Sequence, residues 1–139
     1  MIEQLRAMLV RHEGTRYVMY RDSLGNPTLG VGHLLTVPIT DAAVNQILND
    51  DISDTQQQLA HALSWLNQLD SVRQDVLVDL AFNLGVGGLL GFRHFLAAMQ
   101  AGDWTTAKAE MLNSKWATQV GSRAQELAAM VLGGEYQQP

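Results

Sequence analysis

The spacing of hydrophobic and polar residues predicts one short helix at the start of the chain and extended segments after it. In residues 3–12 the apolar side chains recur at helical spacing, and Gly14 is a residue type that commonly ends a helix. In residues 17–32 aromatic and β-branched residues stand on both sides of a turn cluster at 23–27. This pattern predicts a small antiparallel hairpin sheet, preceded by a helix that carries Glu13 at its C-terminal end.

Residues 41–63 predict a long helix, which Thr40 or Asp41 can cap. Residues 49–58 make its middle too polar to be buried on all sides, as expected of a helix that connects two lobes. The expected buried stripe of this helix consists of Ala43, Ile47, Leu48, Ile52, Leu59 and Leu63.

The second half of the chain predicts a series of shorter helices. The first begins at Ser71, which can form a capping box with Gln74, and a glycine cluster at 85–91 interrupts it. Helical patterns return at 92–100, at 104–113 and from residue 122 onward. The expected caps and stops of these later helices are Gly102, Asp103, Ser122 with Gln125, and the pair Gly133 and Gly134.

Composition is typical of a globular protein and excludes several kinds of chemistry. The 139 residues fit one domain, or two lobes that share one core, and no apolar run approaches the roughly 20 residues of a membrane span. The absence of cysteine excludes disulfides and thiolate catalysis. The four histidines are scattered without the spacing that places two ligands on one helical face, so we expect no metal site.

The charge balance bears on partners and location. Lys and Arg number 9 against 14 Asp and Glu, for a net charge of −5, which disfavours nucleic-acid binding. The first residues form an acidic, amphipathic segment without the basic flank and apolar stretch of a secretory signal, so we expect a chain made and retained in the cytosol. An acidic surface should also be repelled by anionic cell-wall polymers.

Two carboxylates are candidates for glycoside hydrolysis. That reaction needs one carboxylic acid to protonate the leaving oxygen and one carboxylate to activate water or attack. Glu13 ends the first helix and Asp22 ends the first predicted strand, so a hairpin folded back on the helix could aim both at one cleft. On these features alone, the alternative that both are ordinary solvated surface carboxylates is favoured, because most surface carboxylates serve only solvation.

Three motifs in the first half carry a more specific signal. Glu13-Gly14, Tyr20-Arg21-Asp22 and the segment 25–33 (GNPTLGVGH) resemble, in order and in spacing, the signature of the T-even bacteriophage lysozyme family. The resemblance covers nearly the whole chain. It continues through Phe82-Asn83-Leu84-Gly85, Gly91-Phe92, Trp104, Ser114-Lys115-Trp116 and Arg123-Ala124.

The resemblance implies an α+β fold that is mainly helical. It consists of an N-terminal lobe at about 13–50 with a small β-hairpin sheet, a long connecting helix at 41–63, and a helical C-terminal lobe at 64–139 onto which helix 3–12 also packs. The cleft is expected between the lobes.

The same resemblance assigns catalytic roles. Glu13 is the expected general acid, Asp22 the carboxylate that stabilises positive charge or guides water, and Thr28 the hydroxyl that positions the attacking water. The family is associated with inversion at the anomeric carbon, for which the two carboxyl groups should stand about 6.5–9.5 Å apart. From the residue alone, Thr28 is better explained as an ordinary β-branched strand residue.

Supporting residues follow from the same resemblance. Arg123 is expected to reach Glu13 from the other lobe, and His33 to pair with Asp51 on the connecting helix, tying the sheet to it. Each of these also has an ordinary alternative as a surface charge or a satisfied histidine. The expected substrate-binding residues, which could equally be core, are Leu34, Phe82, Asn83 and Trp116.

The implied function is cofactor-free hydrolysis, by a monomer, of the β-1,4 bond between N-acetylmuramic acid and N-acetylglucosamine in peptidoglycan glycan strands. Biologically this resembles an endolysin, made in the host cytoplasm and released to the cell wall through a separate pore, without stable membrane insertion. One rival is a catalytically weak or silent glycan-binding module with the lysozyme fold. It is favoured by the acidic charge and by a shortened segment between His33 and Ser71. It is also favoured by Val86, which stands where known family members carry an acidic residue, and by Phe95 and Glu110, which stand at positions that contact the sugar chain in those members. Another rival is an enzyme that acts on chitin-like chains or by transglycosylation.

Overall fold

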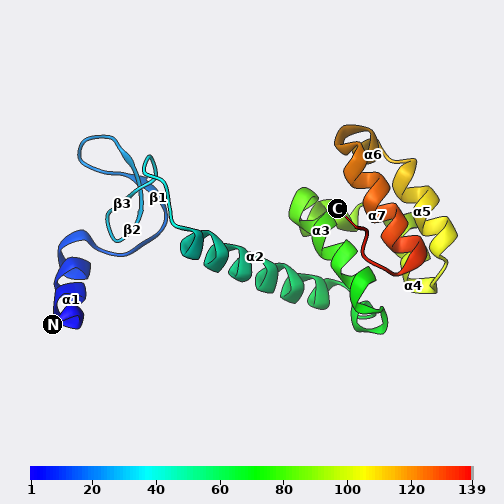
Figure 1. Cartoon of the computed structure of the whole chain (residues 1–139), viewed down its shortest axis with the longest axis horizontal. Coiled ribbons are helices and arrows are strands. Elements are labelled where there is room, and N and C mark those ends of the chain that lie inside the picture. Colours follow the sequence, from blue (N-terminus) through cyan, green and yellow to red (C-terminus); the bar gives the residue numbers. More distant parts are fainter. Residues whose placement is uncertain (139) are drawn as a thin grey trace. The chain divides into compact units, whose positions relative to one another are not determined.

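The computed structural model describes residues 1–138, which form two compact units, Met1–Gln46 and Ile47 onward. The helix α2 runs from the first unit into the second. Figure 1 labels the elements along the chain. These are α1 (Ile2–Glu13), β1 (Arg16–Arg21), β2 (Pro27–Gly30), β3 (His33–Leu34), α2 (Asp41–Ala62), the 3-10 turn η1 (Leu66–Gln68), α3 (Ser71–Leu90), α4 (Arg93–Ala101), α5 (Trp104–Leu112), α6 (Lys115–Val120) and α7 (Ser122–Gly133).

The first unit contains helix α1 and a three-stranded antiparallel sheet in the order β1-β2-β3. Helix α1 ends where predicted, with Gly14 at its C-cap in a backbone conformation of positive φ. The expected hairpin is present, with Tyr20 opposite Thr28, and a bulge interrupts its register between Arg16 and Tyr20. The two-residue strand β3 was not predicted, because a segment this short carries no alternating pattern.

Helix α2 begins as predicted, because the Thr40 hydroxyl accepts a hydrogen bond from the Ala43 backbone N–H at 3.2 Å. Its expected buried stripe is present only near the C-terminal end. Leu59 is fully buried and Leu63 follows it into the core, whereas Ile47 and Leu48 are 52% and 44% exposed. The buried part of α2 therefore belongs to the second unit.

Helix α3 begins on a different cap from the one predicted. The Asp70 carboxylate accepts a hydrogen bond from the Arg73 backbone N–H at 3.1 Å, so Asp70 and not Ser71 is the N-cap. The Gln74 side chain donates to the Leu69 carbonyl instead of closing a capping box. An aspartate and a serine satisfy the free N–H groups of a first turn about equally well, so the sequence alone could not decide between Asp70 and Ser71. The predicted glycine interruption falls at Gly85, with φ of 75°.

Helices α4 to α7 form a cluster in the second unit, in which α5 packs against both α4 and α7 (Figure 1). Gly102 ends α4 in the left-handed conformation and Asp103 caps α5, both as predicted. Helix α6 was missed; it is a single short stretch capped by Ser114. The predicted capping box of α7 is wrong, because Gly121 is the N-cap and Ser122 is already helical.

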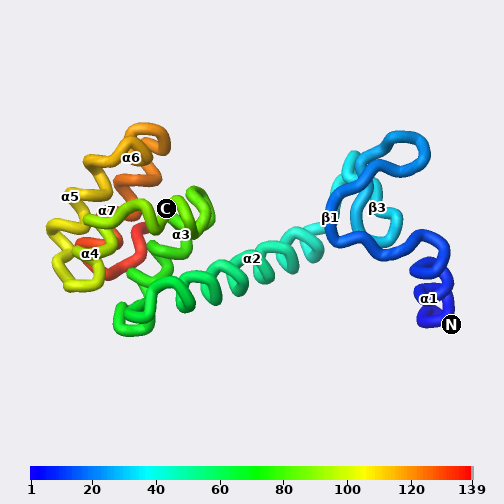
Figure 2. Tube along the Cα trace, turned by 180° about the vertical axis from the view of Figure 1, so that it is seen from behind, coloured from blue at the N-terminus to red at the C-terminus, as the bar shows by residue number. Residues whose placement is uncertain are grey.

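The core lies in the second unit. Its fully buried side chains include Leu77, Leu80, Met99 and Met111, contributed by α3, α4 and α5. By contrast, Thr28 is the one buried residue among the described residues of the first unit. Figure 2, seen from behind, shows the C-terminal segment returning toward α3, where the Tyr136 hydroxyl donates to the Asp75 carboxylate. That hydrogen bond raises the pKa of Tyr136.

An arginine clamp holds the end of α7 to the start of α3. The Arg73 guanidinium lies 3.9 Å from the centroid of the Trp104 ring and donates to the carbonyls of Val131 and Leu132. The Arg73 guanidinium also pairs with the Asp70 carboxylate, 2.9 Å away. Gly134 passes so close that a Cβ there would stand 2.7 Å from Arg73 Nη1. A side chain at position 134 would therefore displace the Arg73 guanidinium from this clamp.

Within residues 1–138, no single helix has the length and apolar composition to cross a membrane. Helices α3 and α4 pass that test only as a pair, bent by 103° at their junction. The described residues also contain no group of three or more histidine, aspartate or glutamate side chains placed to hold a metal ion.

Candidate active site

Glu13 is the last residue of α1, and its exposed side chain lies against the backbone of Gly32. A Cβ built at position 32 would stand 3.0 Å from Glu13 Oε2 and 3.1 Å from Cδ. Gly32 also has a φ of 68°, a conformation that side chains rarely adopt. The loop between β2 and β3 thus brings bare backbone to the carboxyl group of the expected general acid.

Asp22 follows β1 and is held by the turn that it opens. Its Oδ1 accepts hydrogen bonds from the backbone N–H groups of Leu24 at 2.9 Å and Asn26 at 2.8 Å. Its Oδ2 accepts from the Asn26 side-chain amide at 3.3 Å. An aspartate that bonds backbone donors two and four residues onward is a common way to fix a turn, so the catalytic candidate also shapes its own loop.

These donors determine the charge state of Asp22. The backbone hydrogen bond from Asn26 is the main reason that the pKa of Asp22 lies below its usual 3.8, with further help from the Asn26 side chain and the Leu24 N–H. Asp22 is therefore ionised throughout the neutral range. A permanent negative charge suits the role of stabilising a positively charged sugar, and it does not suit proton donation.

Thr28 lies in β2 with 2% of its surface exposed. Its hydroxyl donates to the Asn26 carbonyl at 2.9 Å, so its proton is engaged and its oxygen can still accept a hydrogen bond. Asn26 thereby contacts both Asp22 and Thr28. Leu34, directly opposite Thr28 on β3, is half-buried, and His33 beside it is exposed.

The other predicted site residues lie in the second unit, and there they form their own contacts. Arg123 is held by Asp79: its Nε and Nη2 donate to the Asp79 carboxylate at 2.9 and 2.7 Å, and Nη2 also donates to the Asp79 carbonyl at 3.2 Å. The expected contact of Arg123 with Glu13, which belongs to the first unit, stays a prediction. The same holds for the pairing of His33 with Asp51.

Trp116 and Asn83 form a hydrogen bond, with Trp116 Nε1 donating to Asn83 Oδ1 at 2.6 Å. Trp116 is buried and packs edge-on against Phe92, whereas Phe82 is 44% exposed. Phe82 and Arg123 line one cavity of about 400 Å³ on the face of α2 and α3. Its remaining lining residues are Leu48, Ile52, Gln56, Asp75, Val78 and Asp79.

Three residues of this arrangement were not named as site residues by sequence reasoning. Gly32 and Asn26 stood inside the recognised motif, where a glycine and a turn asparagine indicate backbone shape first. Asp79 carried no signal, because its partner Arg123 is 44 residues away along the chain. Within the first unit, the structure brings Asp22, Asn26 and Thr28 into one network and places Glu13 against Gly32.

Comparison with known proteins identifies the family. The family model described as phage lysozyme matches residues 10–131, which is most of the chain. The chain belongs to the phage lysozyme family. The match includes all three motifs of the first half and the second unit up to α7, so the predicted family and the predicted α+β fold class are confirmed. At this level the chain is a lysozyme-type glycoside hydrolase, as expected.

Individual proteins are also similar to the chain. A probable T4-type lysozyme of Dictyostelium discoideum is 26% identical over 94% of this chain and 94% of its own length. The endolysin of Salmonella phage P22 is 34% identical over 60% of this chain and 62% of its own. The pre-baseplate central spike protein Gp5 of Enterobacteria phage T4 is 32% identical over 91% of this chain, which spans only 27% of that protein.

Proposed function

We propose that this phage lysozyme family member hydrolyses the β-1,4 bond between N-acetylmuramic acid and N-acetylglucosamine in peptidoglycan, with inversion at the anomeric carbon. The observation that carries the proposal is the network in which Asn26 bonds both Asp22 and Thr28, beside a sheet loop that receives Glu13. An inverting glycosidase requires a pair of carboxyl groups. The Thr28 hydroxyl, whose oxygen can still accept a hydrogen bond, can in addition position the attacking water.

In the proposed reaction, Glu13 gives its proton to the glycosidic oxygen as the bond from that oxygen to the anomeric carbon breaks. The negative charge of Asp22 stabilises the positive charge that develops on the sugar ring. Thr28 Oγ1 accepts a hydrogen bond from a water molecule, which orients the water for attack on the opposite face. The water forms the new bond to the anomeric carbon, and its proton passes to Asp22.

The proposal includes the arrangement of the lobes. Helix α1 carries exposed apolar residues, Leu5, Met8 and Leu9, along the face that the sequence assigned to packing on the C-terminal lobe. Packing of that face would place Glu13 within reach of Arg123, whose guanidinium Asp79 already orients. We also propose that His33 pairs with Asp51, and that Leu34, Phe82, Asn83 and Trp116 border the bound glycan.

The biological setting of the proposal is that of an endolysin acting as a monomer. The P22 relative is named an endolysin, which supports release to the cell wall at the end of a phage cycle. Production in the host cytoplasm and passage through a separate pore complete this part of the proposal.

Clearing of purified peptidoglycan by the wild type and by Glu13→Gln tests the central claim. Glu13→Gln removes the proton donor and keeps the shape of the side chain, so clearing should fall to background. Glu3→Gln is the matched control, because Glu3 is an exposed glutamate on the same helix, 3.9 Å from Arg6. Equal clearing by Glu13→Gln would place catalysis elsewhere. No clearing by any of the three proteins would favour the glycan-binding rival.

Analysis of the products tests the finer claims. Inversion predicts that the first-formed reducing end is the α-anomer, which proton NMR resolves before mutarotation. Products with an anhydro end would indicate transglycosylation instead, and mass spectrometry separates the two. Thr28→Val, which removes only the hydroxyl, should slow the reaction without changing the products.

A further inference from the structure

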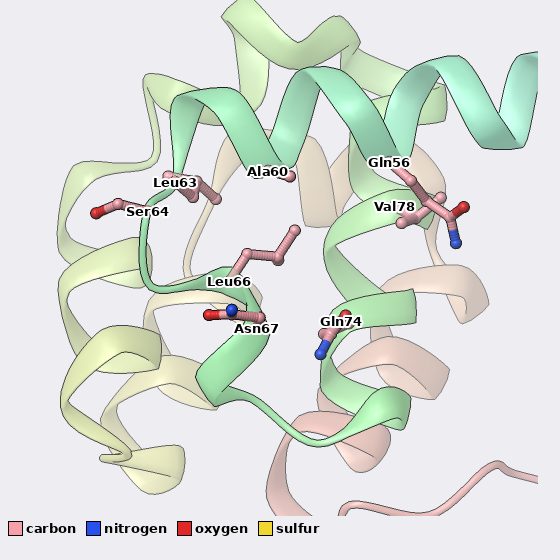
Figure 3. Close-up of a pocket in the computed structure, with 8 residues that line it drawn as sticks. All are labelled: Gln56, Ala60, Leu63, Ser64, Leu66, Asn67, Gln74 and Val78. Atoms are coloured by element: carbon pink, nitrogen blue, oxygen red, sulfur yellow. The ribbon is translucent and has the colours of Figure 1, made fainter.

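A second pocket lies at the C-terminal end of α2, where α2, η1 and the start of α3 meet. Its volume is about 290 Å³, and it shares no residue with the proposed catalytic groups. Figure 3 shows Ala60 on α2 and Leu66 on η1 facing each other across it, with Gln74 and Val78 on the α3 side. The remaining lining residues are Gln56, Leu63, Ser64 and Asn67.

The chemistry of the lining excludes most ligand classes. None of the eight lining residues is charged, so the pocket offers nothing to attract a phosphate, a carboxylate or a metal ion. None is aromatic, so it is no platform for stacking a planar ring. Its volume stands at the lower limit of small-molecule sites, which suits a single sugar unit and not an extended chain.

Three of the four polar side chains that line the pocket are carboxamides, and the fourth is the Ser64 hydroxyl. Gln74 Nε2 donates to the Leu69 carbonyl at 2.8 Å, which fixes this amide and leaves its Oε1 as an acceptor. Asn67 and Gln56 contribute further amide groups from η1 and α2. Between them lies an apolar floor that includes Ala60, Leu66 and Val78. Amide donors and acceptors around a floor of methyl groups complement one group in particular, an acetamido group.

We propose that this pocket binds the acetamido group of an N-acetylated amino sugar. The methyl group packs on Ala60 and Val78, the carbonyl accepts from the Asn67 or Gln56 amide, and the N–H donates to Gln74 Oε1. The choice of ligand rests on the proposed function, since peptidoglycan strands present this group on every sugar. The pocket is then an accessory glycan site that shares no residue with the proposed catalytic groups.

NMR titration of the full-length protein with N-acetylglucosamine tests the pocket without requiring catalysis. Glucose, which lacks the acetamido group, is the matched control ligand. N-acetylglucosamine should shift the side-chain amide signals of Asn67 and Gln74 and the methyl signal of Ala60, and glucose should not. Equal shifts with both sugars, no shifts, or shifts confined to residues around Gly32 would each overturn the proposal.

A pair of variants separates the pocket from the fold. Ala60→Leu fills the pocket from an exposed helical position, and leucine favours a helix almost as well as alanine. Ala62→Leu adds the same bulk at an exposed position of α2 outside the lining. Ala60→Leu should weaken N-acetylglucosamine binding about tenfold and Ala62→Leu should not. Unchanged binding by Ala60→Leu would overturn the proposal.

The two proposals fail separately. Peptidoglycan clearing without shifts at the pocket would remove the accessory site and leave the hydrolase. Shifts at the pocket without clearing would support the site while removing the hydrolytic function.

Discussion

At the scale of single residues, Asn26 connects the two groups proposed to act on the attacking water. Its backbone N–H and side-chain amide donate to Asp22, and its carbonyl accepts from Thr28. The pKa of Asp22 therefore lies below 3.8. The stability that these bonds contribute is fully present above the unfolded-state pKa, and it is lost as the pH falls through the lower folded-state value.

Replacing Asn26 with alanine should raise the pKa of Asp22 without returning it fully to 3.8, because the larger backbone hydrogen bond from residue 26 remains. Carbon-13 titration of the Asp22 carboxyl measures this shift. Asp103 is the internal control, since the Thr106 hydroxyl and backbone donors that lower its pKa are untouched. An unmoved Asp22 midpoint would show that the side-chain amide contributes nothing.

Gly32 offers a sharper test of the Glu13 geometry. Gly32→Ala should cost about 1–2 kcal/mol from its positive φ and push the Glu13 carboxyl aside, reducing peptidoglycan clearing by about a hundredfold. Gly30→Ala is the matched control, because Gly30 has a φ of 67° but nothing within 4 Å of its built Cβ. Urea unfolding should show similar losses for both variants. Equal activity losses would argue against a specific contact with Glu13.

The sequence could predict Glu13, Asp22 and Thr28 as candidates because they stand in a dense local motif. It could not predict the roles of Gly32 and Asn26, which depend on how the turn folds back on the helix end and on the strand. Nor could it predict Asp79, whose contact with Arg123 joins two helices far apart in the chain.

At the scale of the elements, capping residues set most of the helix boundaries. Glycine stops were predictable because few other residues adopt a left-handed conformation at low cost, as at Gly102 and Gly134. N-caps were less predictable. Two candidate residues stood side by side at Asp70 and Ser71, and the structure selects the first.

Gly134→Ala should destabilise the second unit by about 3 kcal/mol, because the strain of a left-handed alanine adds to the displacement of Arg73 from Trp104 and from the α7 carbonyls. Gly102→Ala should cost only about 1 kcal/mol. Gly102 has nearly the same backbone angles, with its nearest neighbour at an ordinary 3.6 Å. Urea unfolding measures both. Equal losses would mean that Arg73 moves aside freely.

At the scale of the whole molecule, charge and the division into units matter most. The predicted fold class holds because helical periodicity and turn residues are strong over long segments. The buried stripe of α2 was predicted along its whole length, but periodicity does not tell which neighbour covers each residue. Only the C-terminal end of α2 is buried, within the second unit.

The net charge of −5 predicts a salt effect on intact cell walls. Raising the ionic strength from about 0.01 to 0.15 M shortens the screening length from about 30 to 8 Å, so clearing of whole cells should increase several-fold. Cleavage of short, uncharged oligosaccharides should change little over the same range. A turbidity assay beside a reducing-end assay measures both, and equal salt responses would exclude repulsion by wall polymers.

The division into units also decides which part of the molecule tryptophan fluorescence monitors. All three tryptophans, Trp65, Trp104 and Trp116, lie in the second unit, whereas the first has only tyrosines. Emission excited in the indole band therefore follows the helical core and the Arg73 clamp, and it is silent about the hairpin that carries Asp22 and Thr28. A tryptophan placed at Tyr20, opposite Thr28 in the sheet, would add a fluorescent reporter to the unit that carries the proposed catalytic residues, read as the difference from the emission of the wild type.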